Sequence, residues 1–337
     1  MANLMVPDNG GKVNGYSGGG VWGSTPVIDS KRNSIYVGTG NNYSVPVSVE
    51  QCFALNNNFP KCADPKDYFD SVVALDLDTG QVNWAARALK YDAWNVNCLE
   101  TIRPPATITF APGPNCPSPA GPDYDFGGAG PNLISMAGRD ILGIGEKSGI
   151  YWAINPNSGA AVWNTQVGPG SSLGGIEWGT ATDGNRIYVA VSNLSGIPYQ
   201  LQPSGASVNS GSWAALDPKN GHILWQTATP GTCSPPIQGS TQGCMALGPA
   251  SVAGGVVFAG SMDPLTRTTD PTGKPHPTMF ALDAKTGNIL WQYEAGSSVN
   301  AAPAIVGNSV YWGSGYGRFN GAFGTGNNQL FAFTIGD

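Results

Sequence analysis

An eleven-residue segment that recurs along the chain restricts the possible folds more than any other feature. Its copies share an Ala, an Asp or Asn two residues later, a Gly and a final Trp, and they occupy residues 74–84, 153–163, 215–225 and 281–291, with a fifth copy beginning at Leu330. In each copy an alternating strand leads into an Asp-x-x-Thr-Gly-like turn, where the carboxylate can accept turn N–H groups and Gly can adopt a positive φ. Each copy therefore predicts a β-hairpin whose Trp packs between neighbouring repeats.

Two further strand-like runs precede the copies of this segment. Examples are residues 25–28 and 34–37 before the first copy, and residues 250–252 and 255–260 before the fourth. Four antiparallel strands in a repeating unit are typical of a β-propeller blade. We therefore predict an all-β fold of about 20 strands with little helix, in about five blades of a single β-propeller domain or propeller fragment. The expected blades cover roughly residues 21–84, 130–163, 174–225, 246–291 and 300–337.

The composition agrees with an all-β chain and argues against several kinds of partner and site. Gly 48 and Pro 27 among 337 residues would interrupt long helices. Charged residues make up only 11%, the formal net charge is −6, and there is no basic cluster, so we expect no nucleic-acid partner. No apolar run approaches the roughly 18 residues of a membrane span. With only 2 His, a His-based triad or a multi-His metal site is nearly excluded.

The six cysteines fall into three pairs of neighbours and lack the CxxC spacing of zinc sites. Their position in loops rich in Gly, Pro and Asn predicts the disulfides Cys52–Cys62, Cys98–Cys116 and Cys233–Cys244, the alternative being free buried thiols. Disulfides indicate an oxidising compartment, and we expect a secreted or periplasmic protein. The opening residues show no signal peptide, which we interpret as a mature piece or a truncated chain.

The repeat resembles the tryptophan-docking motif of the pyrroloquinoline-quinone (PQQ) dehydrogenase propellers. Other segments are similar to the polyvinyl-alcohol-dehydrogenase-like branch of that family, namely residues 21–26, 36–41, 122–127 and 312–317. Rings of this family usually have seven or eight blades, whereas this chain supplies four full blades and three strands of a fifth. The resemblance therefore implies the C-terminal part of such a ring, completed by an N-terminal segment or a partner chain. A subunit of an assembly and an unusual small closed ring are the alternatives.

The resemblance also implies the cofactors PQQ and Ca²⁺ and a set of residues that hold them. Trp22 matches the tryptophan that stacks on the cofactor, and Asn41 matches an amide ligand of Ca²⁺. Lys147 matches the cation that reaches the quinone oxygens. Glu177 and Trp178 lie in a segment similar to one that lines the cofactor, although Glu177 stands where the family has Asn. This carboxylate could join a metal or acid–base site, or it could oppose an anionic cofactor.

The base that removes the alcohol proton is assigned less directly, because an insertion splits the family's usual motif. Asp123 is the better match to the base and Asp92 is the second candidate. Each candidate also has a structural interpretation. Asp92 could be a turn acceptor, and Asp123 or Asp125 could cap a loop after Pro122. Asn41 could be a turn residue, Lys147 could be a solvated hairpin lysine, and Trp22 and Trp178 could pack between blades.

Two hypotheses about function follow. The first is PQQ-dependent oxidation of an alcohol, either polyvinyl-alcohol-like or another primary or secondary alcohol, by this chain or by the protein of which it is the C-terminal part. The second is a non-catalytic propeller that acts as a binding or assembly scaffold, because the same fold serves both roles. The residues do not indicate an electron acceptor.

Overall fold

The fold consists of antiparallel sheets arranged one after another. The computed structural model describes residues 3–10, 12, 14–23, 25–56, 59–98, 113, 115–230, 244–262, 277–315 and 327–334. These residues contain 23 strands, two short α-helices and one 3-10 turn. The all-β prediction is therefore confirmed.

Four of the sheets have four strands each, hydrogen-bonded in chain order. The first sheet contains β2 (Val27–Asp29), β3 (Ser34–Gly38), β5 (Ser71–Asp76) and β6 (Val82–Arg87). The second contains β7 (Asn132–Met136), β8 (Arg139–Gly145), β9 (Ile150–Ile154) and β10 (Ala161–Gln166). The third contains β11 (Ala181–Thr182), β12 (Ile187–Val191), β15 (Ser212–Leu216) and β16 (Ile223–Ala228). The fourth contains β17 (Ser251–Ala253), β18 (Val256–Gly260), β19 (Met279–Asp283) and β20 (Ile289–Tyr293).

A fifth sheet has three described strands, and the remaining elements are insertions. The fifth sheet contains β21 (Ala304–Val306), β22 (Ser309–Ser314) and β23 (Gln329–Thr334). The first insertion contains β4 (Asn42–Ser44), which pairs with β1 (Ser17–Gly18), and the helices α1 (Val47–Asn56) and α2 (Phe59–Cys62). The others are the 3-10 turn η1 (Val96–Cys98) and the hairpin of β13 (Tyr199–Gln200) and β14 (Ser207–Val208).

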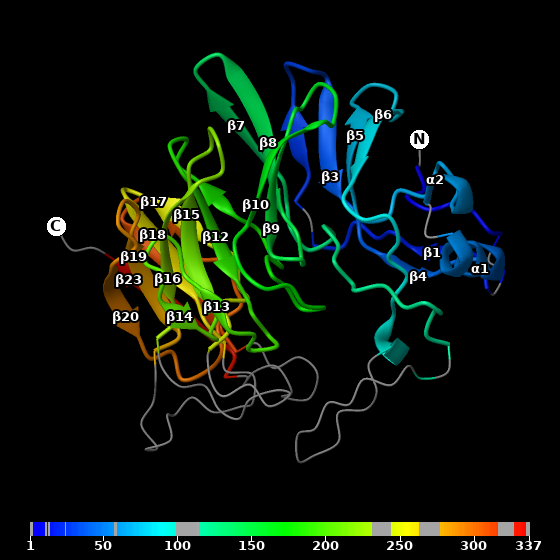
Figure 1. The fold of residues 1–337 in the computed structure, drawn as a ribbon. Helices are drawn as coiled ribbons and strands as arrows, with labels where there is room; N and C mark the ends of the chain where they lie inside the picture. The colour runs from blue at the N-terminus through cyan, green and yellow to red at the C-terminus, as the bar shows by residue number, and fades with distance from the viewer. Residues whose placement is uncertain are drawn as a thin grey trace.

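Figure 1 shows the five sheets succeeding one another from the blue first sheet to the orange fifth. Their first strands β2, β7, β11, β17 and β21 contact one another in that order. This radial arrangement is that of propeller blades, and the expected four complete sheets and three strands of a fifth are present.

The Trp that ends each repeat joins neighbouring sheets, as the sequence predicts. In three repeats the indole Nε1 donates a hydrogen bond of 3.1 Å to a main-chain carbonyl of the next repeat, with the pairs Trp84–Pro156, Trp163–Pro218 and Trp225–Ala284. The repeat glycine makes room for this contact. Gly221 has a φ of +77°, and a Cβ on it would lie 2.5 Å from the Trp163 ring. Glycine is thus required both for the turn and for the approach of the ring.

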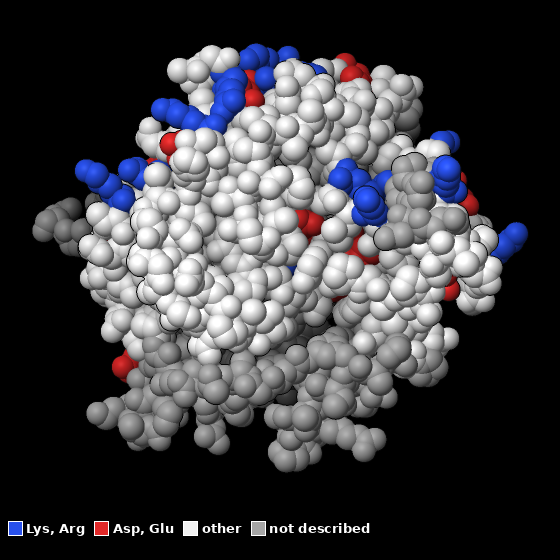
Figure 2. All heavy atoms as spheres, viewed as in Figure 1, with Lys and Arg blue, Asp and Glu red and all other residues white. Residues whose placement is uncertain are grey.

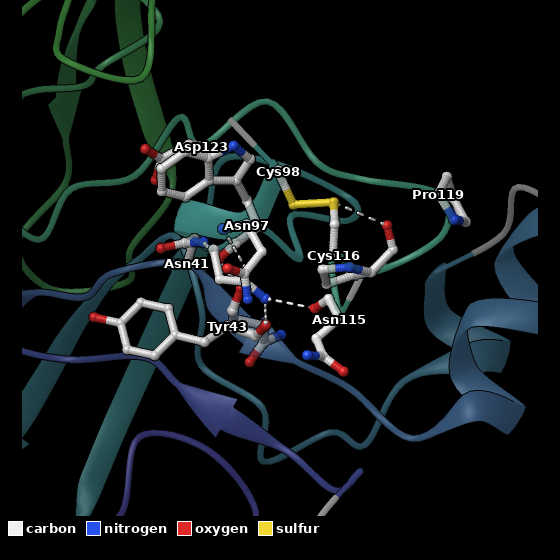
Figure 3. Close-up of a disulfide and its surroundings, with 12 residues drawn as sticks. Asn41, Tyr43, Asn97, Cys98, Asn115, Cys116, Pro119 and Asp123 are labelled. Carbon is white, nitrogen blue, oxygen red and sulfur yellow. Dashed lines mark hydrogen bonds between the residues drawn. A yellow bond between two sulfur atoms is a disulfide. The ribbon is translucent and has the colours of Figure 1, made fainter. Parts of the chain in front are cut away.

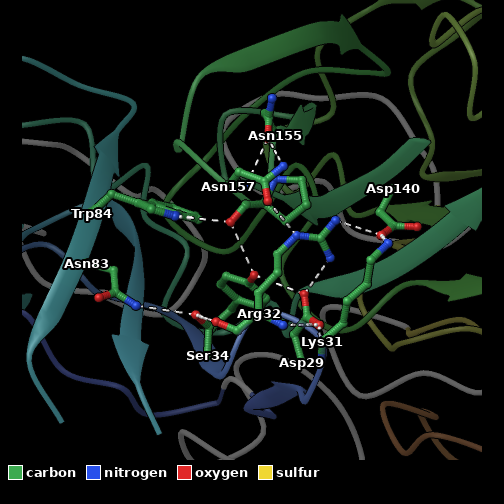
Figure 4. Close-up of polar contacts among 11 residues, drawn as sticks. Asp29, Lys31, Arg32, Ser34, Asn83, Trp84, Asp140, Asn155 and Asn157 are labelled. Atoms are coloured by element: carbon green, nitrogen blue, oxygen red, sulfur yellow. Dashed lines mark hydrogen bonds and ion pairs between the residues drawn. The ribbon is translucent and has the colours of Figure 1, made fainter. Parts of the chain in front are cut away.

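The turn aspartates also behave as the motif predicts, and polar contacts join the first two sheets. Asp283 Oδ1 accepts a hydrogen bond of 2.7 Å from the Thr286 backbone N–H, which closes the β19–β20 turn. In Figure 4, Arg32 lies between Asp29, Asp140 and Asn157. Its guanidinium is 2.7 Å from each of the two carboxylates and 2.9 Å from the Asn157 side-chain oxygen. This arginine therefore links the β2–β3 turn to the second sheet.

Charged side chains are sparse on the face seen in Figure 2. The Lys and Arg residues of this view lie along its upper edge and at its left and right sides, around a broad area in which a few Asp or Glu atoms are visible. No helix among the described residues is long and apolar enough to cross a membrane.

Two of the predicted disulfides are present. Cys52–Cys62 joins the α1 and α2 helices, and Cys98–Cys116 closes a loop between the first and second sheets. Cys244 is disulfide-bonded as well. Its expected partner, Cys233, lies outside the described residues.

Candidate functional site

Two tryptophans, each lying before the first strand of a different sheet, contact one another. Trp22, just before β2, has a side chain that is 45% exposed, and its ring contacts the ring of Trp178 edge-on with centroids 5.3 Å apart. Glycine backbone surrounds the Trp22 indole. A Cβ on Gly40 would lie 3.3 Å from its Nε1, and a Cβ on Gly127 would overlap the same atom. A half-exposed aromatic surface is therefore held in a cradle that side chains would fill.

A buried lysine lies beside this aromatic surface. Lys147 is in the β8–β9 turn and is only 5% exposed, so the interpretation as a solvated hairpin lysine is wrong. Its Nζ is 5.3 Å from the Trp22 ring centroid, 3.2 Å from Asp123 Oδ1 and 3.3 Å from Asp125 Oδ2. Burial alone would lower the pKa of Lys147, but the charges of Asp125, Glu177 and Asp123 raise it well above its usual value. The lysine is therefore a permanent cation within the site.

The loop before the second sheet supplies both carboxylates that contact Lys147. Asp123 is 2% exposed and has a φ of +60°, a left-handed conformation that is uncommon for a residue other than glycine. Burial raises its pKa well above the ordinary value, although Lys147 acts in the opposite direction. Asp125 Oδ1 accepts a hydrogen bond of 2.9 Å from the Gly127 backbone N–H. Asp125 thus shapes the loop as well as pairing with the lysine.

Asn41 reaches the same loop from the first sheet. It follows β3, is 2% exposed, and its backbone N–H lies 3.4 Å from Asp125 Oδ2. Its side-chain Nδ2 donates to the carbonyl oxygens of Asn42 at 2.9 Å and Trp94 at 2.7 Å, which fixes the orientation of the amide. In Figure 3, Asn41 and Asp123 lie on the same side of the Cys98–Cys116 disulfide.

Glu177 adds a third carboxylate around Lys147. It is 3% exposed, and its Oε2 accepts no hydrogen bond from any described residue. Burial raises the pKa of Glu177 to about 7, Lys147 lowers it, and Asp125 raises it further. At the position where the resemblance implies a neutral amide, this chain therefore has a carboxyl group that is costly to ionise.

Asp92 is fully buried and accepts hydrogen bonds from the backbone N–H groups of Asp123 and Tyr124, at 3.1 and 2.7 Å. Burial raises its pKa to about 7, and these two donors lower it. The structural interpretation of Asp92 as a loop acceptor therefore matches its contacts. Direct contacts connect five of the seven candidate residues, in the order Trp178, Trp22, Lys147, Asp123 and Asp92. Asn41 reaches the same loop through Asp125, and Glu177 interacts with Lys147 through its charge.

The candidate set omits two further buried acids of the same region. Asp70 is fully buried, and neither of its carboxylate oxygens accepts a hydrogen bond from a described residue. Burial raises its pKa well above the ordinary value, and Asp92 and Asp125 raise it further. Glu146 precedes Lys147 and accepts hydrogen bonds of 2.7 Å from Ser148 and Trp152. Asp70 resembles an ordinary turn residue in sequence, whereas the position of Glu146 beside Lys147 was a signal that could have been used.

The site lies next to two hollows that share Trp178. One, of about 380 Å³, is lined by residues from all five sheet units, including Gly23, Gly128 and Pro249, and therefore marks the centre of the fold. The other, of about 420 Å³, is lined by Trp178, Pro249, Asn300 and Ser314. In the described part of the chain, no three His, Cys, Asp or Glu side chains are arranged to hold a metal ion by themselves.

Comparisons with known proteins show which families this chain is similar to. The PQQ_2 family model, described as "Outer membrane protein assembly factor BamB", matches residues 146–321. Polyvinylalcohol dehydrogenases of Sphingopyxis sp. (strain 113P3) and Pseudomonas sp are 34% and 30% identical to this chain, and each alignment covers 95% of this chain and 45% of the relative. The chain thus spans about half the length of the curated relatives that it matches.

A solved structure shows the same fold. Quinohemoprotein alcohol dehydrogenase from Comamonas testosteroni superposes with a TM-score of 0.54 at 18% sequence identity. The superposition covers 92% of this chain and 48% of that one. This likeness supports the propeller architecture.

Proposed function

We propose that this chain, which belongs to the PQQ-dependent alcohol-dehydrogenase-like family of β-propellers, carries part of a site that oxidises an alcohol with PQQ. The observation that carries the proposal is the position of Lys147. This buried cation lies 5.3 Å from the half-exposed Trp22 ring and 3.2 Å from Asp123. An aromatic surface, a cation and a carboxylate are the groups that an anionic quinone and an alcohol require.

The residues present fit PQQ on structural grounds. Trp22 offers a half-exposed ring that a flat cofactor can cover, and the glycine cradle keeps other side chains away from its edge. Trp178 would bound the cofactor on one side, and Lys147 would bind its quinone oxygens. When bound, PQQ would supply the hydride acceptor for the alcohol carbon, and Ca²⁺ would supply a Lewis acid beside it.

The fit to Ca²⁺ is partial but chemically reasonable. We assign Asn41 Oδ1 as one ligand, because Ca²⁺ is bound by hard oxygen atoms and the amide is oriented through its nitrogen. The buried carboxylates near Lys147 outnumber the cations there, so a divalent ion would reduce their repulsion. The remaining ligands would come from the cofactor and from residues outside the described chain.

Asp123 is the residue that we assign to take the hydroxyl proton of the alcohol. Lys147 contacts its Oδ1, and no described residue donates a hydrogen bond to its Oδ2, so Oδ2 is the atom that would receive the proton. Lys147 favours the ionised carboxylate that a base requires, whereas burial makes that carboxylate more basic. An ionised Glu177, whose charge also acts on Lys147, would oppose the negative charge of the cofactor.

The proposal also covers the substrate, the location and the completion of the ring. We propose a small or polymeric alcohol as substrate, a secreted or periplasmic location, and a ring completed by an N-terminal segment or a partner chain. The described disulfides are compatible with an oxidising compartment. The chain alone should bind PQQ more weakly than a completed ring, because part of the site would be absent.

The test is calorimetric titration of PQQ with CaCl₂ into the chain, combined with dye-linked oxidation of an alcohol by the full-length protein. Lys147→Met should weaken PQQ binding at least tenfold, whereas Lys285→Met, on an exposed turn, serves as the control and should not change it. Equal binding by wild type and Lys147→Met would overturn the assignment. Absence of both binding and turnover in the full-length protein would favour the scaffold.

A further inference from the structure

A three-residue segment, Asp92 to Trp94, connects the candidate metal ligand to the candidate base. We call this segment the hub. On one side it pairs with the loop that carries Asn41. The Asn42 backbone N–H donates to the Asp92 carbonyl at 3.0 Å, and the Trp94 backbone N–H donates to the Asn42 carbonyl at 2.8 Å. The Asn41 side chain bonds the Trp94 carbonyl at 2.7 Å.

On its other side the hub holds the loop that carries Asp123. The Gly121 backbone N–H donates to the Ala93 carbonyl at 2.8 Å. A Cβ on Gly121 would lie 2.6 Å from the Asp92 Cα, so only glycine permits this approach. The Asp92 carboxylate then accepts the backbone N–H groups of Asp123 and Tyr124, at 3.1 and 2.7 Å, one on each oxygen.

These contacts act on a strained residue. Asp123 has a φ of +60°, a conformation that costs free energy in residues other than glycine, although Asp and Asn tolerate it better than most. Hydrogen bonds to a carboxylate are stronger than those to a neutral oxygen. The Asp92 carboxylate accepts hydrogen bonds from the N–H groups of Asp123 and Tyr124. It therefore restrains the peptide units on both sides of Asp123 and opposes a change of its φ.

The insertion between the hub and Gly121 is closed near its ends. Cys98 and Cys116 form a disulfide, and the Asn95 side chain donates to the carbonyl oxygens of Tyr43 at 2.9 Å and Asn115 at 3.0 Å. Figure 3 shows these contacts between Asn41 and the disulfide. The chain therefore leaves the hub and returns to it through a closed loop.

We infer that Asp92 is a positioning residue that holds the Asp123 backbone in its left-handed conformation and so directs the Asp123 carboxylate toward Lys147. This inference rests on the proposed function for its effect on activity, but the contact itself does not. Asp92 is fully buried and each of its carboxylate oxygens accepts a backbone N–H, so its carboxylate faces the loop rather than an open surface. Its role is to set the place of Asp123.

The first test measures the contact without using activity. Amide hydrogen exchange at Asp123 and Tyr124 is compared in wild type, Asp92→Asn and Asp76→Asn. Asp76 is the matched control because its carboxylate likewise accepts backbone N–H groups, from Asp78 and Thr79 in the β5–β6 turn. Asp92→Asn should accelerate exchange of both amides at least tenfold, and Asp76→Asn should leave them unchanged. Unaltered exchange in Asp92→Asn would overturn the inference.

A second variant covers the case in which Asp92→Asn does not fold. Glycine adopts a positive φ without support, so Asp123→Gly should remove much of the need for Asp92. The Asp92→Asn change should therefore destabilise Asp123→Gly less than it destabilises wild type, or the double variant should fold where the single one does not. An equal loss of stability in both backgrounds, or failure of both variants to fold, would contradict the role of Asp92.

Activity then separates positioning from base catalysis. In the full-length protein with PQQ and Ca²⁺, Asp92→Asn should lower kcat per bound PQQ at least tenfold while the KM for alcohol and the PQQ affinity stay within twofold. Unchanged kcat would contradict positioning. Turnover retained in Asp123→Asn and lost in Asp92→Asn would make Asp92 the base. If wild type oxidises no alcohol, the proposed function fails, and hydrogen exchange still decides whether Asp92 holds the loop.

Discussion

The substitution Glu177→Gln tests the electrostatics of the site most directly. Burial raises the pKa of Glu177 to about 7, whereas its ordinary value is 4.5. The folded chain therefore holds this proton more tightly than the unfolded chain does. The contribution of Glu177 to the free energy of unfolding must then fall as pH rises from 4.5 to about 7, and the loss is complete above that range. One pH unit is worth about 1.4 kcal/mol, so the total loss is about 3 kcal/mol.

Glutamine removes this titration and keeps the shape of the side chain. The stability of Glu177→Gln relative to wild type should therefore increase by about 3 kcal/mol between pH 4.5 and pH 8. Any cost of burying the amide is the same at both pH values and cancels in the comparison. The measurement is urea unfolding followed by tryptophan fluorescence at both pH values, with the exposed Glu294→Gln as the control.

The reasoning would be refuted if wild type and Glu177→Gln showed the same dependence of stability on pH. The same substitution bears on function. Removing a carboxylate beside Lys147 should strengthen binding of the anionic cofactor, measured by the PQQ titration at pH 8. Weaker binding in Glu177→Gln would instead indicate that the carboxylate contributes to the cofactor or metal site.

Three further changes test separate parts of the structure. Lys147→Met leaves buried carboxylates without their cation and should cost about 3–5 kcal/mol in urea unfolding at pH 7, whereas a loss below about 1 kcal/mol would show that the ion pairs are unimportant. The double variant Cys98→Ser, Cys116→Ser removes a disulfide between residues 18 positions apart and should lower the free energy of unfolding by about 3 kcal/mol. An unchanged midpoint of thermal unfolding would contradict this expectation. Trp163→Phe removes the indole N–H that donates to the next sheet and should lower the free energy of unfolding by about 1–3 kcal/mol. Unfolding of both proteins at the same urea concentration would contradict this expectation.

The fold was predictable because its determinants are local and repeated. The turn Asp, the positive-φ Gly and the terminal Trp lie within one eleven-residue segment, and each repeat contains the same three positions. Gly221 and Trp163 show why the pattern is so regular, since the glycine of one repeat makes room for the Trp of the previous one. Because every copy must supply both residues, the constraint appears in the sequence as a regular repeat.

For the candidate site, the sequence predicted a set of residues, and the structure shows where they lie. Resemblance named Trp22, Lys147 and Asp123, and the structure brings them together. It did not indicate that Lys147 is buried between two carboxylates, because a lysine in a hairpin turn is usually solvated. The acid Asp70 gave no signal, since its buried and unpaired carboxylate depends on residues far away in the chain.

The sequence by itself therefore determined the repeating unit and the order of the sheets, and it supplied the candidate residues of the proposed site. Only the tertiary structure decided which of those residues are buried, which pair with one another and which act on the backbone of another. Asp92 and Asp123 are separated by 31 residues and an insertion, yet a carboxylate of one holds the backbone of the other. The physical reason is that burial and electrostatic coupling depend on distance in space, and loops of unequal length between the strands set that distance independently of the local pattern.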